Sequence, residues 1–149
     1  MFPNLFQRTF LFVDIIIVLL VLIPFCIYLR SLQKTLEFIS PENRKMPPAR
    51  VWITAIPIYG AIWHFFVVNA MADSLRLEFL KNNIRLKTPR PTYQMGLTTS
   101  LCAASSVIPQ MGMVFLFAAL VCWIIYWVQV GECRNKIEHA RMREKLTAV

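Results

Sequence analysis

Four polar residues stand inside long apolar stretches or at their ends, and these are the side chains best placed to do chemistry: Asp14, His64, Asn69 and Asp73. An ionised carboxylate in apolar surroundings is costly unless it is paired, so Asp14 could hold an ion, a proton or another helix. A neutral imidazole such as that of His64 can hydrogen-bond between helices, ligate a metal or haem, or pass protons. These four are the candidate functional residues of the chain.

Asp14 and His64 also have plainer structural interpretations. Asp14 lies about four residues inside its apolar run, close enough to the end for the cost of its charge to be small. His64 has no second histidine in an apolar stretch, because His139 lies in the charged tail, and this argues against a bis-histidine haem. Packing and hydrogen bonding between helices would account for His64 without a cofactor.

Asn69 and Asp73 are four residues apart and therefore share one face of a helix. Arg76 follows three residues after Asp73, at a spacing that allows a local ion pair. The plainer interpretation of this group is the polar end of a helix as it leaves an apolar environment.

No catalytic or nucleotide-binding motif is present: the sequence lacks a phosphate-binding P-loop, a dinucleotide-binding glycine motif, a zinc-protease helix and a serine-hydrolase elbow. The cysteines are never spaced as CxxC, which predicts small buried side chains rather than a disulfide or zinc framework. They are Cys26, Cys102, Cys122 and Cys133. We therefore predict no catalytic residues, no metal site and no cofactor.

The elements that carry these residues follow from composition. Hydrophobic residues make up 57% of the 149 residues and charged residues 16%, against about 25% charged in a typical soluble domain. This excludes a water-soluble monomer and a disordered chain. A bilayer core of about 30 Å needs about 20 helical residues, and the ranges 10–29 and 51–72 have this length. The sequence predicts an all-α polytopic membrane protein with a single transmembrane domain over residues 1–149.

A third apolar region has 39 residues without a charge, which is too long for one span. Because Pro109 and Gly112 interrupt it, we divide it into spans over 92–108 and 112–130, giving four transmembrane helices in total. The alternative is three spans, the last being one long kinked helix. Residues 131–149 continue as a charged helical tail, either solvated or docked on a partner.

Small residues lie four apart along the third predicted span, at Gly96, Ser100 and Ala104. In lipid, small residues let helix backbones approach closely, because apolar burial does not drive helices together there. We therefore expect helix packing at this stripe, and we expect the third span to be the most buried helix.

The motif Ile-Pro-x-x-Gly occurs twice, 52 residues apart, at residues 56–60 and 108–112. Each copy precedes an apolar helix with a charged extension, which suggests two tandem hairpins in parallel orientation. The other explanation is chance, since membrane helices often contain Pro and Gly. The candidate turn or kink residues are Pro57, Gly60, Pro109 and Gly112.

The formal net charge is +8, and apart from Arg8 the lysines and arginines fall in three patches, 30–50, 76–90 and 134–145. In an apolar chain such patches face anionic lipid headgroups, and none of them interleaves aromatic residues and glycines as RNA-binding platforms do, so nucleic acid is not predicted as a partner. Cytoplasmic loops are rich in Lys and Arg. The four-span and three-span topologies both place the first two patches on opposite sides and the C-terminus in the cytoplasm.

Six segments spread over most of the chain carry a resemblance to known proteins: LQK at 32–34, SPENR at 40–44, VWI at 51–53, IPIYGAIWHF at 56–65, DSL at 73–75 and CWIIYWV at 122–128. They resemble an uncharacterised family of small bacterial multi-spanning inner-membrane proteins. The resemblance implies a multi-pass protein of the bacterial inner membrane and carries no activity with it.

The absence of a reactive site beside a packing stripe and a charged tail favours a non-catalytic subunit or scaffold of a membrane complex. The predicted partners are the lipid bilayer and either copies of the chain or other membrane-protein subunits, since four helices bury little among themselves. An alternative is an oligomeric channel or transporter component that uses Asp14, His64, Asn69 and the small and polar residues of the third predicted span. An enzyme or a haem carrier is the third hypothesis.

Overall fold

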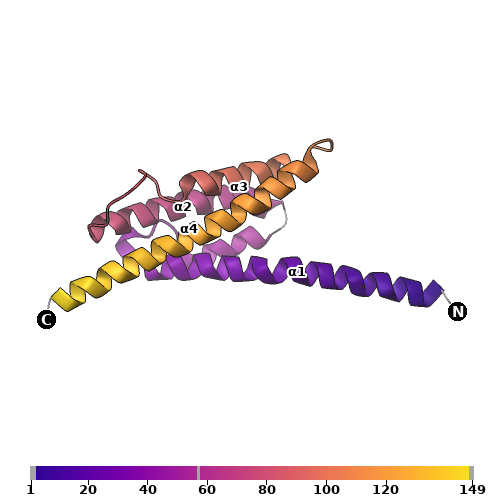
Figure 1. The fold of residues 1–149 in the computed structure, drawn as a ribbon, viewed down its shortest axis with the longest axis horizontal. Coiled ribbons are helices and arrows are strands. Elements are labelled where there is room, and N and C mark those ends of the chain that lie inside the picture. The colour runs from indigo at the N-terminus through magenta and orange to yellow at the C-terminus, as the bar shows by residue number, and fades with distance from the viewer. Residues whose placement is uncertain (1–2, 57, 148–149) are drawn as a thin grey trace.

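The computed structural model describes residues 3–56 and 58–147, and this part of the chain is all-α, as predicted, with no β-strand. The elements in chain order are α1 (Pro3–Phe38), the 3-10 helices η1 (Pro41–Asn43) and η2 (Pro48–Ala55), α2 (Tyr59–Lys81), α3 (Tyr93–Ser105) and α4 (Gly112–Thr147). Figure 1 shows α1 as a long rod, with the other elements gathered along its C-terminal half.

Helix α1 has two halves with different surroundings. Its C-terminal half turns Tyr28, Leu32 and Leu36 into the protein core at helical spacing, and all three are fully buried. The described side chains between Phe12 and Ile23 are all exposed, and this half extends alone beyond the other elements in Figure 1. The fold therefore uses only one half of α1.

The predicted second span, residues 51–72, is not one helix. The chain runs through η2 to Ile56 and resumes at Ile58 before α2, which packs against η2; Pro57, one of the predicted turn or kink residues, lies outside the described residues. Ile58 has a φ of 65°, a region that β-branched residues rarely adopt. A Cβ on Gly60 would lie 2.0 Å from the carbonyl oxygen of Thr54, so only glycine allows this close approach of two backbone segments. The motif reverses the chain here instead of kinking a helix.

The second Ile-Pro-x-x-Gly motif also makes a turn, between α3 and α4, and Pro109 lies in it. In both motifs the isoleucine N–H donates to the carbonyl three residues earlier: Ile56 to Ile53 and Ile108 to Ser105, each at 3.1 Å. Helices α3 and α4 then lie side by side. They are separate helices, so the single kinked helix of the three-span alternative is wrong.

Two segments of the described chain are long and apolar enough to cross a membrane, Phe12–Phe38 in α1 and Gly112–Leu146 in α4. The predicted number of four is therefore too high. The turn before α2 divides the second predicted span, and the third is reduced to α3, whose 13 residues are about 20 Å long.

All three basic patches lie at one end of the molecule. Figure 1 shows the C-terminal ends of α1, α2 and α4 at this end, while the N-terminal ends of α1, α2 and α4 lie toward the other. The patches 30–50, 76–90 and 134–145 contain every lysine and arginine except Arg8. Both predicted topologies separate the first two patches, and this separation is wrong because α2 runs back to the end of the molecule at which α1 ends.

The core lies between α2, α4 and the C-terminal half of α1. Helix α2 has ten buried residues and α3 has three. The most buried helix is therefore α2, and the prediction for the third span is wrong, because α3 packs against α2 and α4 along one stripe and leaves its other faces exposed.

Candidate functional site

His64 is the centre of a hydrogen-bonded chain that joins three helices. Its Nε2 lies 2.8 Å from the Tyr28 hydroxyl of α1, and its Nδ1 lies 2.6 Å from Ser100 Oγ of α3. Ser100 also donates to the Gly96 carbonyl at 3.0 Å. Every proton has an acceptor if Tyr28 donates to Nε2 and Nδ1–H donates to Ser100, which assigns the neutral Nδ1–H tautomer.

Aromatic rings and a small cavity surround this chain. The ring centroid of Tyr28 lies 5.2 Å from that of Trp123, and the His64 centroid lies 6.1 Å from that of Tyr126. A cavity of about 210 Å³ adjoins Tyr28, His64 and Ser100. Thr54 also lines it, and the buried Thr54 hydroxyl has no hydrogen-bond partner in the described chain. Both nitrogens of the imidazole are engaged, so its role in this geometry is to connect helices.

Asn69 and Asp73 do not form a site with His64. The side-chain amide of Asn69 donates to the carbonyl of Phe65 in its own helix, at 2.9 Å. Asp73 pairs with Arg90, not with Arg76 as its spacing suggested: Arg90 donates to both carboxylate oxygens at 2.8 Å. This pair fixes the loop that leads into α3.

Asp14 lies in the free half of α1, where its side chain is exposed. Fourteen residues of one helix separate it from Tyr28, a distance of about 21 Å. The four sequence candidates therefore lie at separate places and do not form one centre.

The predicted packing stripe is used along part of its length. A Cβ on Gly96 would lie 2.6 Å from Val68 Cγ1 and 2.8 Å from Tyr126 Cε2, so the glycine brings α3 close to both neighbours. Ser100 is buried against His64, as described above, whereas Ala104 is exposed. The contact between α3 and α2 thus ends before Ala104.

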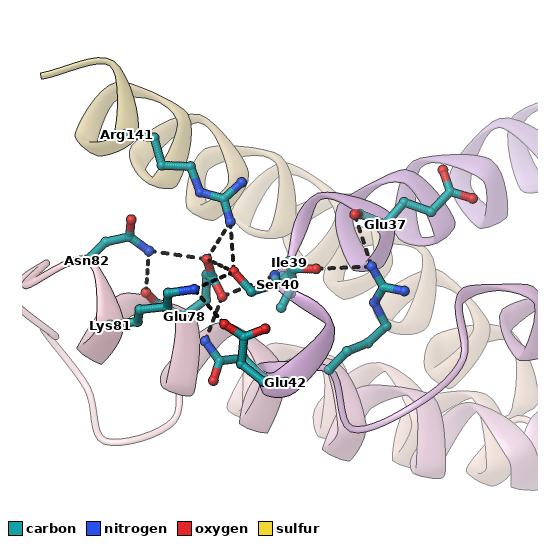
Figure 2. Close-up of polar contacts among 10 residues, drawn as sticks. Glu37, Ile39, Ser40, Glu42, Glu78, Lys81, Asn82 and Arg141 are labelled. Carbon is teal, nitrogen blue, oxygen red and sulfur yellow. Dashed lines mark hydrogen bonds and ion pairs between the residues drawn. The ribbon is translucent and has the colours of Figure 1, made fainter. Parts of the chain in front are cut away.

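A second polar group, which sequence reasoning did not single out, lies at the charged end (Figure 2). We call it the ionic cluster; its members are Ser40, Glu42, Asn43, Glu78, Lys81, Asn82 and Arg141. Glu78 of α2 is fully buried, and Arg141 of α4 donates to it at 2.5 Å. Asn43 donates at 2.8 Å, and the N–H and hydroxyl of Ser40 donate at 3.2 and 3.0 Å.

The electrostatics of the ionic cluster favour the ionised carboxylate. Burial acts to raise the pKa of Glu78, but the hydrogen bonds from Asn43, Arg141 and Ser40 outweigh it and lower the pKa from 4.5 to about 2. Arg141 also lies over the ring of Phe38, 4.6 Å from its centroid. The cluster joins the end of α1, the loop after it, α2 and the tail part of α4, which packs on the protein instead of standing free in solvent.

The sequence held a weak signal for this cluster. Glu78 and Asn82 are four apart on one helix, and Ser40 and Asn43 lie in a polar segment. The partners of Glu78, however, are 38 residues away at Ser40 and 63 residues away at Arg141, so only the fold brings them together.

The described part of the chain has no metal site: it contains no cluster of three His, Cys, Asp or Glu side chains able to hold a metal ion. Cys26, Cys102, Cys122 and Cys133 are free thiols. Comparison with protein families, with curated proteins and with solved structures found no match to this chain. The proposals below therefore rest on its own geometry.

Proposed function

We propose that this chain is a non-catalytic integral membrane protein that serves as a subunit or scaffold of a membrane complex. The observation that carries the proposal is the free half of α1. Its apolar side chains are exposed on every face, with Leu20 at 71% and Val21 at 65%. A soluble protein would bury such a helix, whereas a membrane protein presents it to lipid or to another helix.

The membrane placement follows from charge. The three basic patches lie at one end, and the positive-inside rule assigns that end to the cytoplasm. The C-terminus is then cytoplasmic, and α1 crosses the membrane from the far side. If the membrane is a bacterial inner membrane, as the family resemblance implies, the anionic leaflet faces the basic patches.

Two hairpins, η2 with α2 and α3 with α4, would enter the membrane, and their depth in it follows from the length of α3 and from the residues at their tips. Helix α3 is about 20 Å long, short of a bilayer core of about 30 Å. The tips have no charged residue, and Ile58 and Val107 are 88% and 82% exposed. We therefore propose that both hairpins enter from the cytoplasmic side and turn within the apolar layer. Helix α4 is long enough to cross, but it is joined to the shorter α3 and turns back with it, so that only α1 crosses the layer completely.

The subunit role follows from what the polar groups do. His64, Asp73 and Glu78 are all bonded within the chain, so they stabilise the fold and offer no reactive group. Asp14, in contrast, lies in the free half of α1, outside the packed body. A carboxylate in an apolar helix is a usual contact point for a second transmembrane helix.

Cross-linking in native membranes tests the subunit role. A photo-reactive residue at Leu20 should give a discrete adduct of constant mass, because a specific partner helix packs on α1. The matched control is Met113, which is 83% exposed at the tip of the second hairpin and should give lipid adducts only. Lipid adducts alone at both positions would reject the subunit role.

The cavity beside His64 favours one alternative, an oligomeric channel or transporter component, because its lining includes His64, Thr54 and Ser100. In that case liposomes containing the protein should show ion or solute flux, and His64→Ala should reduce it. A flux that is absent, or equal in both proteins, would remove this alternative.

A further inference from the structure

Helix α1 has a proline in its interior, and this proline lies where the free half of the helix meets the half that packs on the protein. Pro24 is inside α1, which continues through it from Pro3 to Phe38. Before it, the described side chains between Phe12 and Ile23 are exposed. After it, Phe25 is the first described residue of α1 that packs against the core. The boundary between the two halves therefore falls at the proline.

Pro24 interrupts the backbone hydrogen bonds of α1. In an α-helix the N–H of each residue donates to the carbonyl four residues earlier, and for residue 24 this acceptor is the carbonyl of Leu20. Proline has no N–H, and its ring crowds the same carbonyl. The turn from Leu20 to Pro24, which we call the hinge turn, therefore lacks one of the hydrogen bonds that hold a helix straight.

Neither a local side chain nor a neighbouring element takes the place of this hydrogen bond. Prolines are tolerated in membrane helices because neighbouring helices, ordered water or Ser and Thr side chains satisfy the freed backbone groups. Residues 15–25 contain no Ser, Thr, Asn, Gln or charged side chain. Leu20, Val21 and Ile23 are exposed, so no other described element covers the hinge turn. The hinge turn is thus the least supported turn between the two halves of α1.

The half of α1 that follows the hinge turn is held at several points. The Tyr28 hydroxyl lies 2.8 Å from His64 Nε2, and the Tyr28 ring lies against Trp123 with 5.2 Å between the centroids. Leu29 and Leu32 are fully buried. A change of helix angle at the hinge turn would therefore move the free half and leave the packed half in place.

We propose that α1 is hinged at Pro24, and that the free half tilts relative to the packed body. Sharp changes of helix direction occur mainly at proline, and hinges are a few residues that absorb a change in backbone angles. The tilt of a membrane helix is set by packing against its neighbours. The free half packs on no other described element, so its angle is left to lipid or to a partner helix. This use of the hinge rests on the subunit role proposed above, whereas the hinge itself does not.

Distances between paired spin labels test the hinge, in the full chain in lipid nanodiscs and with the native cysteines replaced. One pair joins the free half to α4, at Ile16→Cys and Phe117→Cys, which are 62% and 71% exposed. Its distance distribution should be broad. Pro24→Ala restores the N–H and should narrow this distribution to the width of a pair within the packed body, Arg30→Cys with Leu80→Cys.

The matched control is Ile23→Ala, which removes side-chain volume from the same turn, leaves Pro24 in place and should keep the broad distribution. A free-half distribution as narrow as that of the packed pair would overturn the hinge. So would a distribution that Pro24→Ala leaves broad, or one that Ile23→Ala narrows equally.

The cross-link at Leu20 separates this proposal from the subunit role. A discrete adduct in a chain whose α1 gives a narrow distribution would overturn the hinge alone. A broad distribution that Pro24→Ala narrows, without a protein adduct at Leu20, would reject the subunit role and leave the hinge standing.

Discussion

Glu78 shows how one buried carboxylate can hold several segments together. It accepts hydrogen bonds from Ser40 and Asn43 in the first loop, from Asn82 directly after its own helix and from Arg141 in the tail. A buried charge is tolerated only when its lone pairs are used in this way, and removing one partner of a buried pair typically costs about 3–5 kcal/mol. The ionic cluster should therefore be a point of high sensitivity.

Glu78→Gln is predicted to lower the free energy of unfolding by roughly 3 kcal/mol at neutral pH. A glutamate carboxyl ordinarily has a pKa of 4.5, and the folded chain lowers the pKa of Glu78 to about 2. The contribution of Glu78 to stability is therefore fully present above pH 4.5 and is lost as the pH falls toward 2. Thermal unfolding in uncharged detergent between these pH values should show a loss in the wild type that the variant lacks.

The control for this prediction is Glu42→Gln. Glu42 pairs with Lys81 at 2.6 Å on the exposed side of the same cluster, so its removal should leave the unfolding midpoint within error. An equal pH dependence in the wild type and Glu78→Gln would show that other carboxylates govern acid unfolding.

A double-mutant cycle at Tyr28 and His64 tests whether their hydrogen bond connects the helices. Tyr28→Phe and His64→Leu should each lower the free energy of unfolding by about 1–3 kcal/mol, because each leaves one buried polar group without a partner. The double variant removes both groups and should cost less than the sum of the single variants. Additive losses, measured by unfolding in detergent, would show that the two residues act independently.

Among the elements, the two hairpins have turns of the same construction. In each, the isoleucine N–H closes a tight turn, and a glycine lies against a carbonyl six residues earlier: Gly60 against Thr54 and Gly112 against Ser106. Further backbone hydrogen bonds, from Gly60 to Ile56 and from Met111 to Ile108, tighten the two turns. The repeated motif therefore has one physical role at both places.

Gly60→Ala is predicted to lower the free energy of unfolding by more than about 1 kcal/mol, because the new Cβ would meet the backbone oxygen of Thr54 at 2.0 Å. Gly131→Ala is the matched control. Gly131 lies within α4, and a Cβ there would meet nothing within 4 Å, so alanine should raise helix stability by roughly 0.5–1 kcal/mol. Equal effects of the two substitutions in thermal unfolding would reject the close approach at Gly60.

At the scale of the whole molecule, local patterns predicted the helices better than the path of the chain. The charged extensions predicted for the second and fourth spans are continuous with α2 and α4, which end at Lys81 and Thr147. The path was wrong because we took each apolar run to be a crossing helix, while the motif at 56–60 reverses the chain. All three basic patches favour the cytoplasmic side of a membrane. This preference argues against the four-span and three-span topologies, which place the first two patches on opposite sides.

For the polar sites too, local patterns predicted single residues, whereas the fold determined their partners. His64 was predicted as an interhelical hydrogen-bonding residue, and the sequence could not name Tyr28 as its partner because the two are 36 residues apart. The ionic cluster depends on Arg141 of α4, which meets Glu78 of α2 only when the chain folds back along itself. Contacts between distant segments are the part that composition and spacing did not specify.

Cysteine labelling in intact cells tests the proposed path of the chain, in a background where the four native cysteines are replaced by serine or alanine. Lys45→Cys and Arg85→Cys should both react only from the cytoplasmic side, because the basic patches share one end of the molecule. Asn4→Cys should react only from outside. Gln110→Cys, at the tip of the second hairpin, should react from neither side and become accessible after denaturation. Labelling of positions 45 and 85 from opposite sides would reject the shared end, and labelling of position 110 from outside would show that α3 and α4 cross the membrane.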